Sequence, residues 1–212
     1  MAAMTKFVIL LGGSVTPTRR LQKQVLGAQV IAADGGMQHA EILGLNPELW
    51  VGDFDSTSPH LDRKYRDTPR QKFPVEKDAT DGELAIAEAL RRGATEIILV
   101  GGFGGQFDHA LAHAGFLLAL AKRGMNIFMT SGNEEAFPLV QDLILENLQM
   151  GTRLSIAPFS DLRGLTVTGV RWPLQKHNVP LGSALTLANI VTGTVQLELL
   201  SGSALVLIYP IE

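Results

Sequence analysis

The sequence contains no cysteine, few aromatic residues, and no long run of apolar or like-charged residues. Without cysteine, disulfides, zinc–thiolate sites and thiol nucleophiles are excluded, which fits a cytoplasmic protein. No apolar run approaches the roughly 18 residues that a membrane-spanning helix needs, and Phe7–Leu11 is too short for a secretory signal. A formal net charge of -3 argues against a nucleic-acid partner, which would require a basic surface. We therefore expect neither a membrane nor a nucleic acid as partner.

Two different patterns divide the 212 residues. Up to about residue 130, short apolar runs alternate with helix-like stretches, which predicts a mostly parallel sheet with helices on its faces. From about residue 140 onward, short β-rich runs are separated by Gly, Pro, Ser or Asn, which predicts an antiparallel β-sandwich without helices. We therefore predict an α/β domain over residues 1–135 and a β-sandwich domain over residues 145–212.

The individual elements follow from the same patterns. The strands predicted in the first half are Phe7–Leu11, Val30–Ala33, Trp50–Val51, Phe73–Val75 and Glu96–Val100. The helices predicted there lie near residues 17–26, 36–43, 80–92 and 108–122, and each is followed by a glycine, as helix C-termini often are. The strands predicted in the second half are Thr152–Ala157, Leu165–Val170, Leu185–Asn189, Thr194–Leu199 and Ala204–Tyr209.

Polar residues that directly follow the predicted strands are the candidate site residues, because ligands of open parallel sheets bind beyond the carboxyl ends of the strands. Asp34, Gly35 and Gly36 follow the second strand, and the glycines permit a tight turn with close backbone approach to a ligand. Asp34 has an equally good interpretation as the cap of the following helix. This turn is therefore a candidate site on position alone.

Asp53 and Asp55 follow the third predicted strand. In extended backbone their carboxylates would share one side and repel each other, and a divalent cation such as Mg²⁺ would hold them together. The alternative is a solvated Asx turn. The position after a strand favours the cation.

A third acidic segment, Lys77 to Glu83, precedes an apolar-periodic helix. Thr80 and Glu83 have the spacing of a capping box, which is a purely structural role. That role does not account for Asp78 and Asp81, which we interpret as acids that recruit a metal carrying phosphates to the helix N-terminus.

A glycine-rich loop follows the strand Glu96–Val100, with four glycines between positions 101 and 105. Such a loop suits a phosphate cradle of backbone N–H groups, although it matches neither the dinucleotide nor the P-loop pattern. His109 and His113 then stand four residues apart, which is zinc-ligand spacing, but we favour a packed or hydrogen-bonded His113. The loop is therefore predicted to bind phosphate.

Taken together and in order, these segments resemble the thiamine pyrophosphokinase family. The matching pieces are Asp34-Gly35-Gly36, Gly52-Asp53-Phe54-Asp55-Ser56, Lys77-Asp78-Ala79-Thr80-Asp81-Gly82-Glu83, Gly104-Gly105-Gln106-Phe107-Asp108-His109, Gly169-Val170-Arg171-Trp172-Pro173-Leu174, and Gly182-Ser183 with Ala188-Asn189. The resemblance covers nearly the whole chain. It implies an ATP- and Mg²⁺-binding α/β domain, a thiamine-side β-sandwich, and a homodimer whose active sites lie between subunits.

The resemblance also implies roles for individual residues. The catalytic acids are expected to be Asp53, Asp55, Asp78, Asp81 and Asp108, of which Asp53, Asp55 and Asp81 hold the metal. ATP and its phosphates are expected at Asp34, Gly35, Gly36, Lys77, Gly102, Gly104, Gly105, Gln106 and His109. Thiamine is expected at Trp172, Ser183 and Asn189, with Trp172 stacking from the partner subunit; its alternative is a core anchor of the sandwich.

The expected reaction is transfer of pyrophosphate from ATP to the hydroxyethyl group of thiamine, giving thiamine diphosphate and AMP, with Asp78 or Asp108 as proton acceptor. The chain departs from the family at Gln106, where Arg is usual, at His113, near a usual Asn, and at Ala188, where Ser is usual. These departures keep two alternatives open. One is a pyrophosphokinase for another small alcohol, such as a pterin or a thiamine analogue, and the other is a non-catalytic nucleotide- or thiamine-binding regulator.

Overall fold

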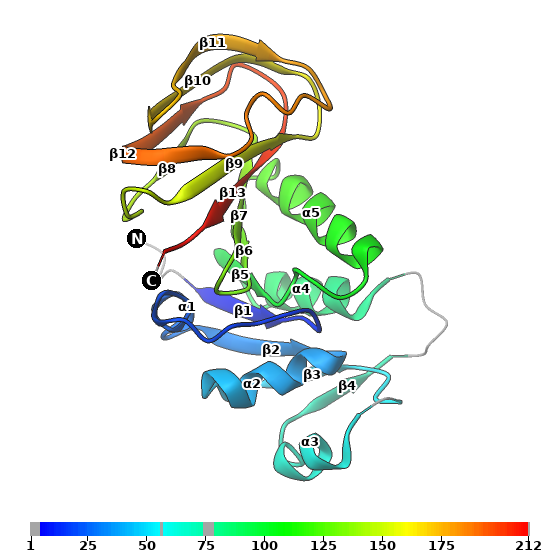
Figure 1. Cartoon of the computed structure of the whole chain (residues 1–212). Coiled ribbons are helices and arrows are strands. Elements are labelled where there is room, and N and C mark those ends of the chain that lie inside the picture. The colour runs from blue at the N-terminus through cyan, green and yellow to red at the C-terminus, as the bar shows by residue number, and fades with distance from the viewer. Residues whose placement is uncertain (1–4, 56, 74–78, 212) are drawn as a thin grey trace. The chain divides into compact units, whose positions relative to one another are not determined.

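The computed structural model describes residues 5–55, 57–73 and 79–211. The chain divides into two compact units (Figure 1). The first unit comprises the chain up to Ala110 together with Met125–Gly132, and the second comprises Leu111–Gly124 together with the chain from Asn133. The predicted domain boundaries at 135 and 145 stay predictions, and the contact-based division additionally gives Leu111–Gly124 to the second unit.

The first unit is built on a six-stranded parallel sheet with the order β6-β5-β1-β2-β3-β4. Its strands are β1 (Lys6–Leu10), β2 (Gln29–Ala33), β3 (Leu49–Gly52), β4 (Arg70–Lys72), β5 (Glu96–Val100) and β6 (Asn126–Thr130). The central strands β1, β2, β3 and β5 read as continuous apolar runs because both of their faces are buried, and Phe7 to Leu10 are fully buried. The predicted parallel sheet is thus confirmed.

Helices connect these parallel strands. They are α1 (Arg19–Val25), the 3₁₀ turn η1 (Asp34–Gly36), α2 (Met37–Leu43), α3 (Pro59–Lys64), α4 (Asp81–Arg91) and α5 (Phe107–Ala121). Helix α2 packs on β1 and β2, while α4 packs on β1, β2 and β3. Strand order reverses between β1 and β5, so the crevice outside their carboxyl ends is the expected ligand position. None of the helices in these described ranges is long and apolar enough to cross a membrane.

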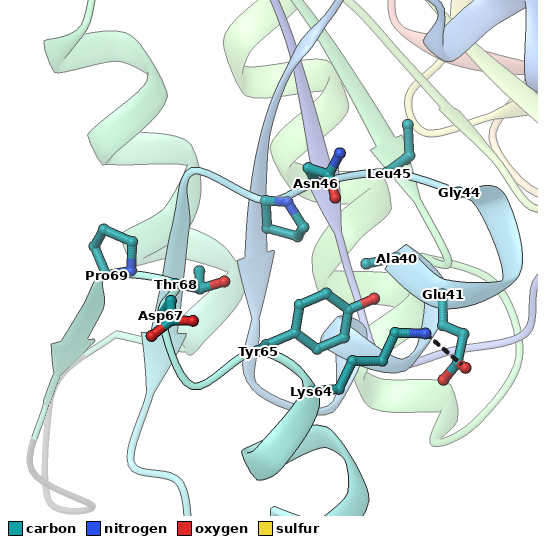
Figure 2. Close-up of a pocket in the computed structure, with 11 residues that line it drawn as sticks. Ala40, Glu41, Gly44, Leu45, Asn46, Lys64, Tyr65, Asp67, Thr68 and Pro69 are labelled. Atoms are coloured by element: carbon teal, nitrogen blue, oxygen red, sulfur yellow. Dashed lines mark ion pairs between the residues drawn. The ribbon is translucent and has the colours of Figure 1, made fainter.

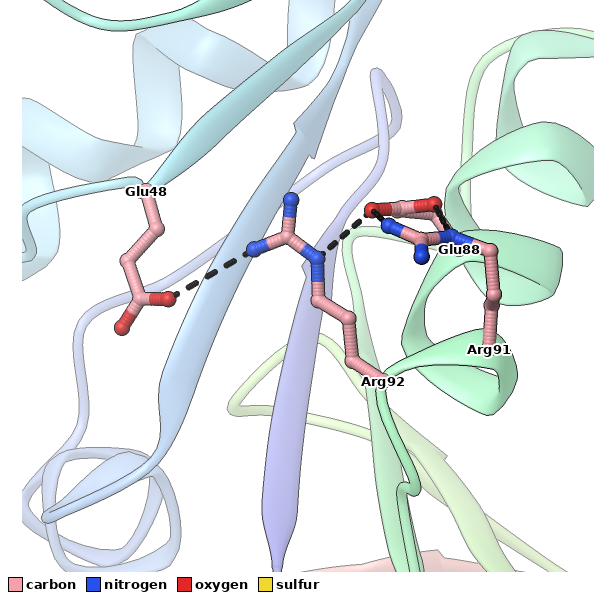
Figure 3. A network of polar contacts seen from close by, with 4 residues as sticks. All are labelled: Glu48, Glu88, Arg91 and Arg92. Atoms are coloured by element: carbon pink, nitrogen blue, oxygen red, sulfur yellow. Dashed lines mark hydrogen bonds and ion pairs between the residues drawn. The ribbon is translucent and has the colours of Figure 1, made fainter.

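The C-terminal end of α4 is fixed by an ionic network (Figure 3). The Glu88 carboxylate accepts from Arg91 at 2.7 and 2.8 Å and from Arg92 at 2.6 Å, and Arg92 also lies 3.7 Å from the Glu48 carboxylate before β3. Hydrogen bonds from Arg91, and then from Arg92, lower the pKa of Glu88 to about 2. The network therefore ties the end of α4 to the segment that enters β3.

The second unit is an antiparallel strand assembly, as predicted. Its strands are β7 (Glu135–Leu139), β8 (Leu143–Leu145), β9 (Arg153–Pro158), β10 (Leu162–Val170), β11 (Leu174–Val179), β12 (Asn189–Glu198) and β13 (Ala204–Tyr209). They follow the order β11-β10-β12-β9-β13-β7, and β8 pairs with β12. Every one of these strands contributes buried apolar side chains to a single core.

Several element predictions were wrong or incomplete. The predicted strand Leu185–Asn189 is a turn region that joins β12 only at its last residue. Leu185 and Leu187 are exposed, and Ala188 has a φ of 59°, which interrupts extended backbone. Val75 lies outside the described residues, and the short strand of this region is the earlier Arg70–Lys72.

Other elements were not predicted at all. Helix α3 buries no residue, so its sequence shows no apolar periodicity, although Ser58 caps it and Pro59 opens it. Strand β6 has a plain apolar run, Ile127 to Met129, which could have identified it. Strand β11 has a mostly exposed, polar sequence, so neither periodicity nor apolar content marks it.

Candidate active site

The carboxyl ends of β2 and β3 bring Asp34 and Gly52 into contact. The two strands are adjacent and parallel, and a Cβ on Gly52 would lie 3.3 Å from the Cα of Asp34 and 3.4 Å from its Oδ1. The Trp50 indole N–H donates to the Asp34 carbonyl oxygen at 2.9 Å, which fixes the turn from the side of β3. The predicted turn after the second strand therefore lies directly beside the predicted acid pair after the third.

The pKa of Asp34 is shifted by its position at this edge of the sheet. Its pKa is raised, first by partial burial and then by the charges of Asp81, Asp53 and Asp55, against a hydrogen bond from Gly35. Three carboxylates from two other segments thus act on Asp34. The φ of Asp34 is 42°, a left-handed conformation that Asp tolerates better than most residues. Asp34 belongs to a 3₁₀ turn and does not cap α2.

Asp53 and Asp55 adopt the Asx turn that was the alternative to an extended pair. The Asp55 N–H donates to Asp53 Oδ1 at 3.1 Å. Between them, Phe54 has a φ of 64°, which is unusual for a bulky residue and marks backbone strain. The expectation of extended backbone is wrong because the left-handed residue turns the chain back toward the first carboxylate.

Asp81 opens helix α4, whose start is the predicted capping box. The Thr80 side chain accepts from the Glu83 N–H at 3.2 Å, and the Glu83 carboxylate accepts from the Thr80 N–H at 2.6 Å. The box fixes the first turn and with it the position of Asp81. Lys77 and Asp78 lie outside the described residues.

The glycine-rich loop is joined to the segment that follows β1. The N–H groups of Gly13 and Ser14 donate to the carbonyls of Gly101 and Phe103 at 2.8 and 2.7 Å. Gly104 and Gly105 both have φ near 70°, a conformation that favours glycine. Gln106 is exposed, so its amide is accessible at the start of α5.

Asp108 and His109 lie in the exposed first turn of α5. The His109 N–H donates to Asp108 Oδ1 at 2.9 Å. The structure thus places both at the helix N-terminus, directly after the loop. Gly102 belongs to the loop, and His113 belongs to α5.

Sequence reasoning missed the segment Gly12-Gly13-Ser14 and the buried His39 that supports it. His39, on α2, lies 2.8 Å through Nε2 from the Gly13 carbonyl oxygen, and burial lowers its pKa. The ring is therefore neutral near pH 7, and Nε2 donates to Gly13. The missed signal was Gly-Gly-Ser directly after a central parallel strand.

The acids have few internal partners. Within residues 5–55, 57–73 and 79–211, Asp34, Asp53 and Asp55 form no ion pair. The same part of the chain contains no group of three or more His, Cys, Asp or Glu side chains arranged to hold a metal by themselves. A cation at this edge would therefore need oxygens from phosphate or water besides carboxylates.

In the second unit, the structure joins two of the three residues expected at thiamine. The Asn189 side chain accepts from the Trp172 N–H at 3.1 Å and donates to the Trp172 carbonyl at 2.8 Å. The Trp172 side chain is 57% exposed, so it is not a core anchor of the sandwich. Ser183 lies in the turn region before β12, where its Oγ accepts from the Leu185 N–H at 3.2 Å.

The first unit also has a pocket of about 460 Å³ at the opposite, amino ends of β3 and β4 (Figure 2). Its lining includes Tyr65 and the ion pair between Lys64 Nζ and Glu41 at 2.7 Å. None of the predicted site residues lines it. The chemistry-bearing groups instead gather at the carboxyl ends of the strands.

An open parallel sheet with acids and glycine-rich turns at its carboxyl edge is an arrangement found in many nucleotide-binding proteins of the α/β class. Comparison with protein families identifies the particular family. The thiamin pyrophosphokinase catalytic domain matches residues 23–129, and the thiamin pyrophosphokinase vitamin B1 binding domain matches residues 142–203. The chain belongs to the thiamin pyrophosphokinase family.

Individual relatives agree with this assignment. A thiamine pyrophosphokinase of Bacillus subtilis is 30% identical over 164 residues, which cover 75% of this chain and 76% of the relative. A crystal structure of thiamine pyrophosphokinase from Bacillus subtilis has a TM-score of 0.86 at 24% identity and covers 98% of this chain and 100% of that one. The thiamin pyrophosphokinase structure from Candida albicans has a TM-score of 0.79 at 15% identity, with coverages of 98% and 90%. These structures show that the fold is shared.

Proposed function

We propose that this protein transfers the pyrophosphoryl group of ATP to the hydroxyethyl side chain of thiamine, releasing thiamine diphosphate and AMP. The observation that carries the proposal is that Asp34, at the end of β2, lies beside Gly52 and the Asp53–Asp55 turn at the end of β3, inside the segment that matches the catalytic family model. The charges of Asp81 and of the Asp53–Asp55 turn oppose ionisation of partly buried Asp34, and a cation bound with the triphosphate would offset them.

The residues present fit Mg²⁺. Their donors are all carboxylate oxygens, which Mg²⁺ prefers, and it ordinarily takes one or two such ligands and completes its shell with water and phosphate. Asp53, Asp55 and Asp81 are the carboxylates from which these one or two ligands would come, because the described residues include no group of three acids arranged to hold a metal by themselves. When bound, Mg²⁺ would supply charge neutralisation at the transferring phosphates.

The chain's own groups would position the reactants. The N–H groups of the turns at Gly35 and Gly105 would donate to phosphate oxygens, and the Gln106 amide would add a neutral donor. Asp108, exposed in the first turn of α5, would accept the proton of the thiamine hydroxyl. Asp78 is the other candidate for this role. Positioning and charge stabilisation dominate such reactions, so little covalent work falls to the protein.

The metal role is tested with Asp55→Asn, compared with Asp67→Asn as the control. Asp67 is in the same unit, and its side chain is 92% exposed in an ion pair with Arg66. We expect Asp55→Asn to slow turnover by at least about 100-fold in saturating Mg²⁺ without unfolding the protein. The control should stay near wild type. Turnover of Asp55→Asn within a few-fold of wild type would remove it from the metal site.

We further propose that the protein is a homodimer with shared sites, in which exposed Trp172 stacks on the thiamine of the partner subunit. The test mixes Asp55→Ala chains with Trp172→Ala chains, each nearly inactive alone. In a mixed dimer one site collects both lesions and the other neither. Because about half of randomly paired dimers are mixed, about a quarter of wild-type activity should return. No recovery, with mixed dimers shown to be present, contradicts shared sites.

A further inference from the structure

The structure assigns to Arg70, a residue outside every acidic or glycine-rich segment of the site, the role of a positioning residue for the metal-binding turn Asp53-Phe54-Asp55. This inference rests on the proposed function, because it concerns the affinity of that turn for a divalent cation. Two contacts of Arg70 and the backbone conformation of the turn carry it.

The first contact is a stack of three side chains. Arg70 on the edge strand β4 stands in register beside Trp50 on β3. Its guanidinium lies 4.7 Å from the centroid of the Trp50 ring and 5.3 Å from that of Phe54. The two rings meet edge to face, 5.2 Å apart at 88°. A planar cation that lies against two rings fixes both of them.

The second contact anchors the guanidinium through its Nη1 atom. Arg70 donates through Nη1 to the Asp62 carboxylate of α3 at 2.8 Å. The Arg70 side chain is 30% exposed, so the stack is only partly screened by solvent. Helix α3 buries no residue of its own, and this ion pair gives it a connection to the sheet.

The backbone conformation of the turn explains why its side chains need to be held in place. Phe54 has a φ of 64° and Asp34 a φ of 42°, and strained residues keep such conformations only where their surroundings fix them. Trp50 fixes Asp34 through its indole N–H and fixes Phe54 through its ring. Arg70 closes this arrangement, so the orientation of Asp53 and Asp55 depends on a residue that carries the charge opposite to theirs.

That charge makes the role testable, because electrostatics and positioning predict opposite signs. Removing a cation near acidic ligands should strengthen Mn²⁺ binding if charge alone matters. If Arg70 positions the turn, its loss should weaken Mn²⁺ binding about tenfold, the scale seen when groups that orient metal ligands are removed. Arg70→Lys retains the charge but loses the planar stack, so we expect a similar loss.

The experiment measures Mn²⁺ binding to the whole chain by electron paramagnetic resonance, and the Mg²⁺ concentration for half-maximal turnover. The variants are Arg70→Leu, Arg70→Lys and Asp62→Asn, with Asp55→Asn as the reference without the site. Arg66→Leu is the matched control, since Arg66 is 77% exposed in the same unit and lies in none of these contacts. We expect about tenfold weaker Mn²⁺ binding for both Arg70 variants, a smaller loss for Asp62→Asn, and none for Arg66→Leu.

Each result separates the two hypotheses. If Asp55→Asn abolishes Mn²⁺ binding but both Arg70 variants bind Mn²⁺ as wild type does, the positioning role is refuted and the metal site stands. This holds even if the Arg70 variants have a lowered melting temperature. Tighter binding by Arg70→Leu refutes it as well. Wild-type binding no stronger than that of Asp55→Asn refutes the proposed metal site, and this inference with it. If Arg70→Leu does not fold, Arg70→Lys and Asp62→Asn decide the question.

Discussion

The adjacent glycines of the Asp34-Gly35-Gly36 turn should respond very differently to the same substitution. A Cβ at Gly36 would lie 2.5 Å from the carbonyl carbon of Leu10 and 2.8 Å from the amide nitrogen of Leu11, and closer still to the Leu10 oxygen. All three atoms belong to the backbone at the end of β1, the central strand, whose residue Leu10 is completely buried. Nothing lies within 4 Å of a Cβ at Gly35.

The magnitudes follow from what must move. Gly36→Ala forces either η1 or β1 to shift, so we expect a loss of about 3 kcal/mol in the free energy of unfolding, the upper part of the range for overpacking. Gly35→Ala meets no atom and needs no left-handed backbone. It should leave that free energy within about 0.5 kcal/mol, or raise it slightly by restricting the unfolded chain. Urea denaturation of the two variants beside wild type measures both quantities.

The same pair separates packing from ligand binding. Because the space at Gly35 is open at the predicted phosphate edge, Gly35→Ala should weaken ATP binding in calorimetric titrations although the fold is intact. Equal losses of stability for the two variants, or a stable Gly36→Ala, would contradict the reasoning from backbone contact. Unchanged ATP affinity in Gly35→Ala would remove this turn from the phosphate site.

Three further predictions concern charge. Asp34→Asn should raise the free energy of unfolding at pH 7 by about 0.5–2 kcal/mol, because the raised pKa of Asp34 means that its charged form destabilises the fold. This gain should vanish below pH 3.8, the ordinary pKa of an aspartate, where the carboxyl is protonated in both the folded and the unfolded chain. A gain that does not change with pH in denaturation series would contradict this reasoning. Glu88→Gln should lower the free energy of unfolding by about 1 kcal/mol at neutral pH, a small value because Arg91 is 72% exposed and solvent screens the ion pair. Because the pKa of Glu88 is lowered in the folded protein, the difference from wild type in denaturation series should fade as the pH falls from 4.5 to about 2. A difference that stays constant over this range would contradict the role of the ion pairs. Gln106→Arg should strengthen ATP binding by restoring a charge-assisted donor at the loop, whereas weaker binding together with slower turnover indicates a site rebuilt around glutamine.

Much of the first unit could be predicted from sequence because its signals are local. Buried parallel strands are continuous apolar runs, and Thr80 with Glu83 has the spacing of a capping box. The position of Asp34 and Asp53 at strand ends also follows, since adjacent parallel strands end at one edge. The contacts that join these two strand ends could not be predicted from the sequence. The hydrogen bond from Trp50 to Asp34 and the stack of Arg70 on Trp50 depend on the register between neighbouring strands.

The failures have equally specific causes. Phe54 in a left-handed conformation is disfavoured locally, and only its packing on Trp50 reveals why it is held there, so an extended acid pair was the natural expectation. Leu185 and Leu187 alternate like strand residues, yet both are exposed and Ala188 breaks the strand. Strand β4 has no apolar residue at all, because an edge strand can be held by its backbone alone.

If this chain moves the β- and γ-phosphates of ATP together onto thiamine, a phosphate label in the γ position must appear in thiamine diphosphate. Incubation of the purified protein with γ-³²P-labelled ATP, thiamine and Mg²⁺ should give AMP and labelled thiamine diphosphate in equal amounts, with no AMP when thiamine is omitted. Asp55→Asn should reduce both products together. Release of ADP, AMP formation that does not depend on thiamine, or nucleotide binding without any product would each contradict the account.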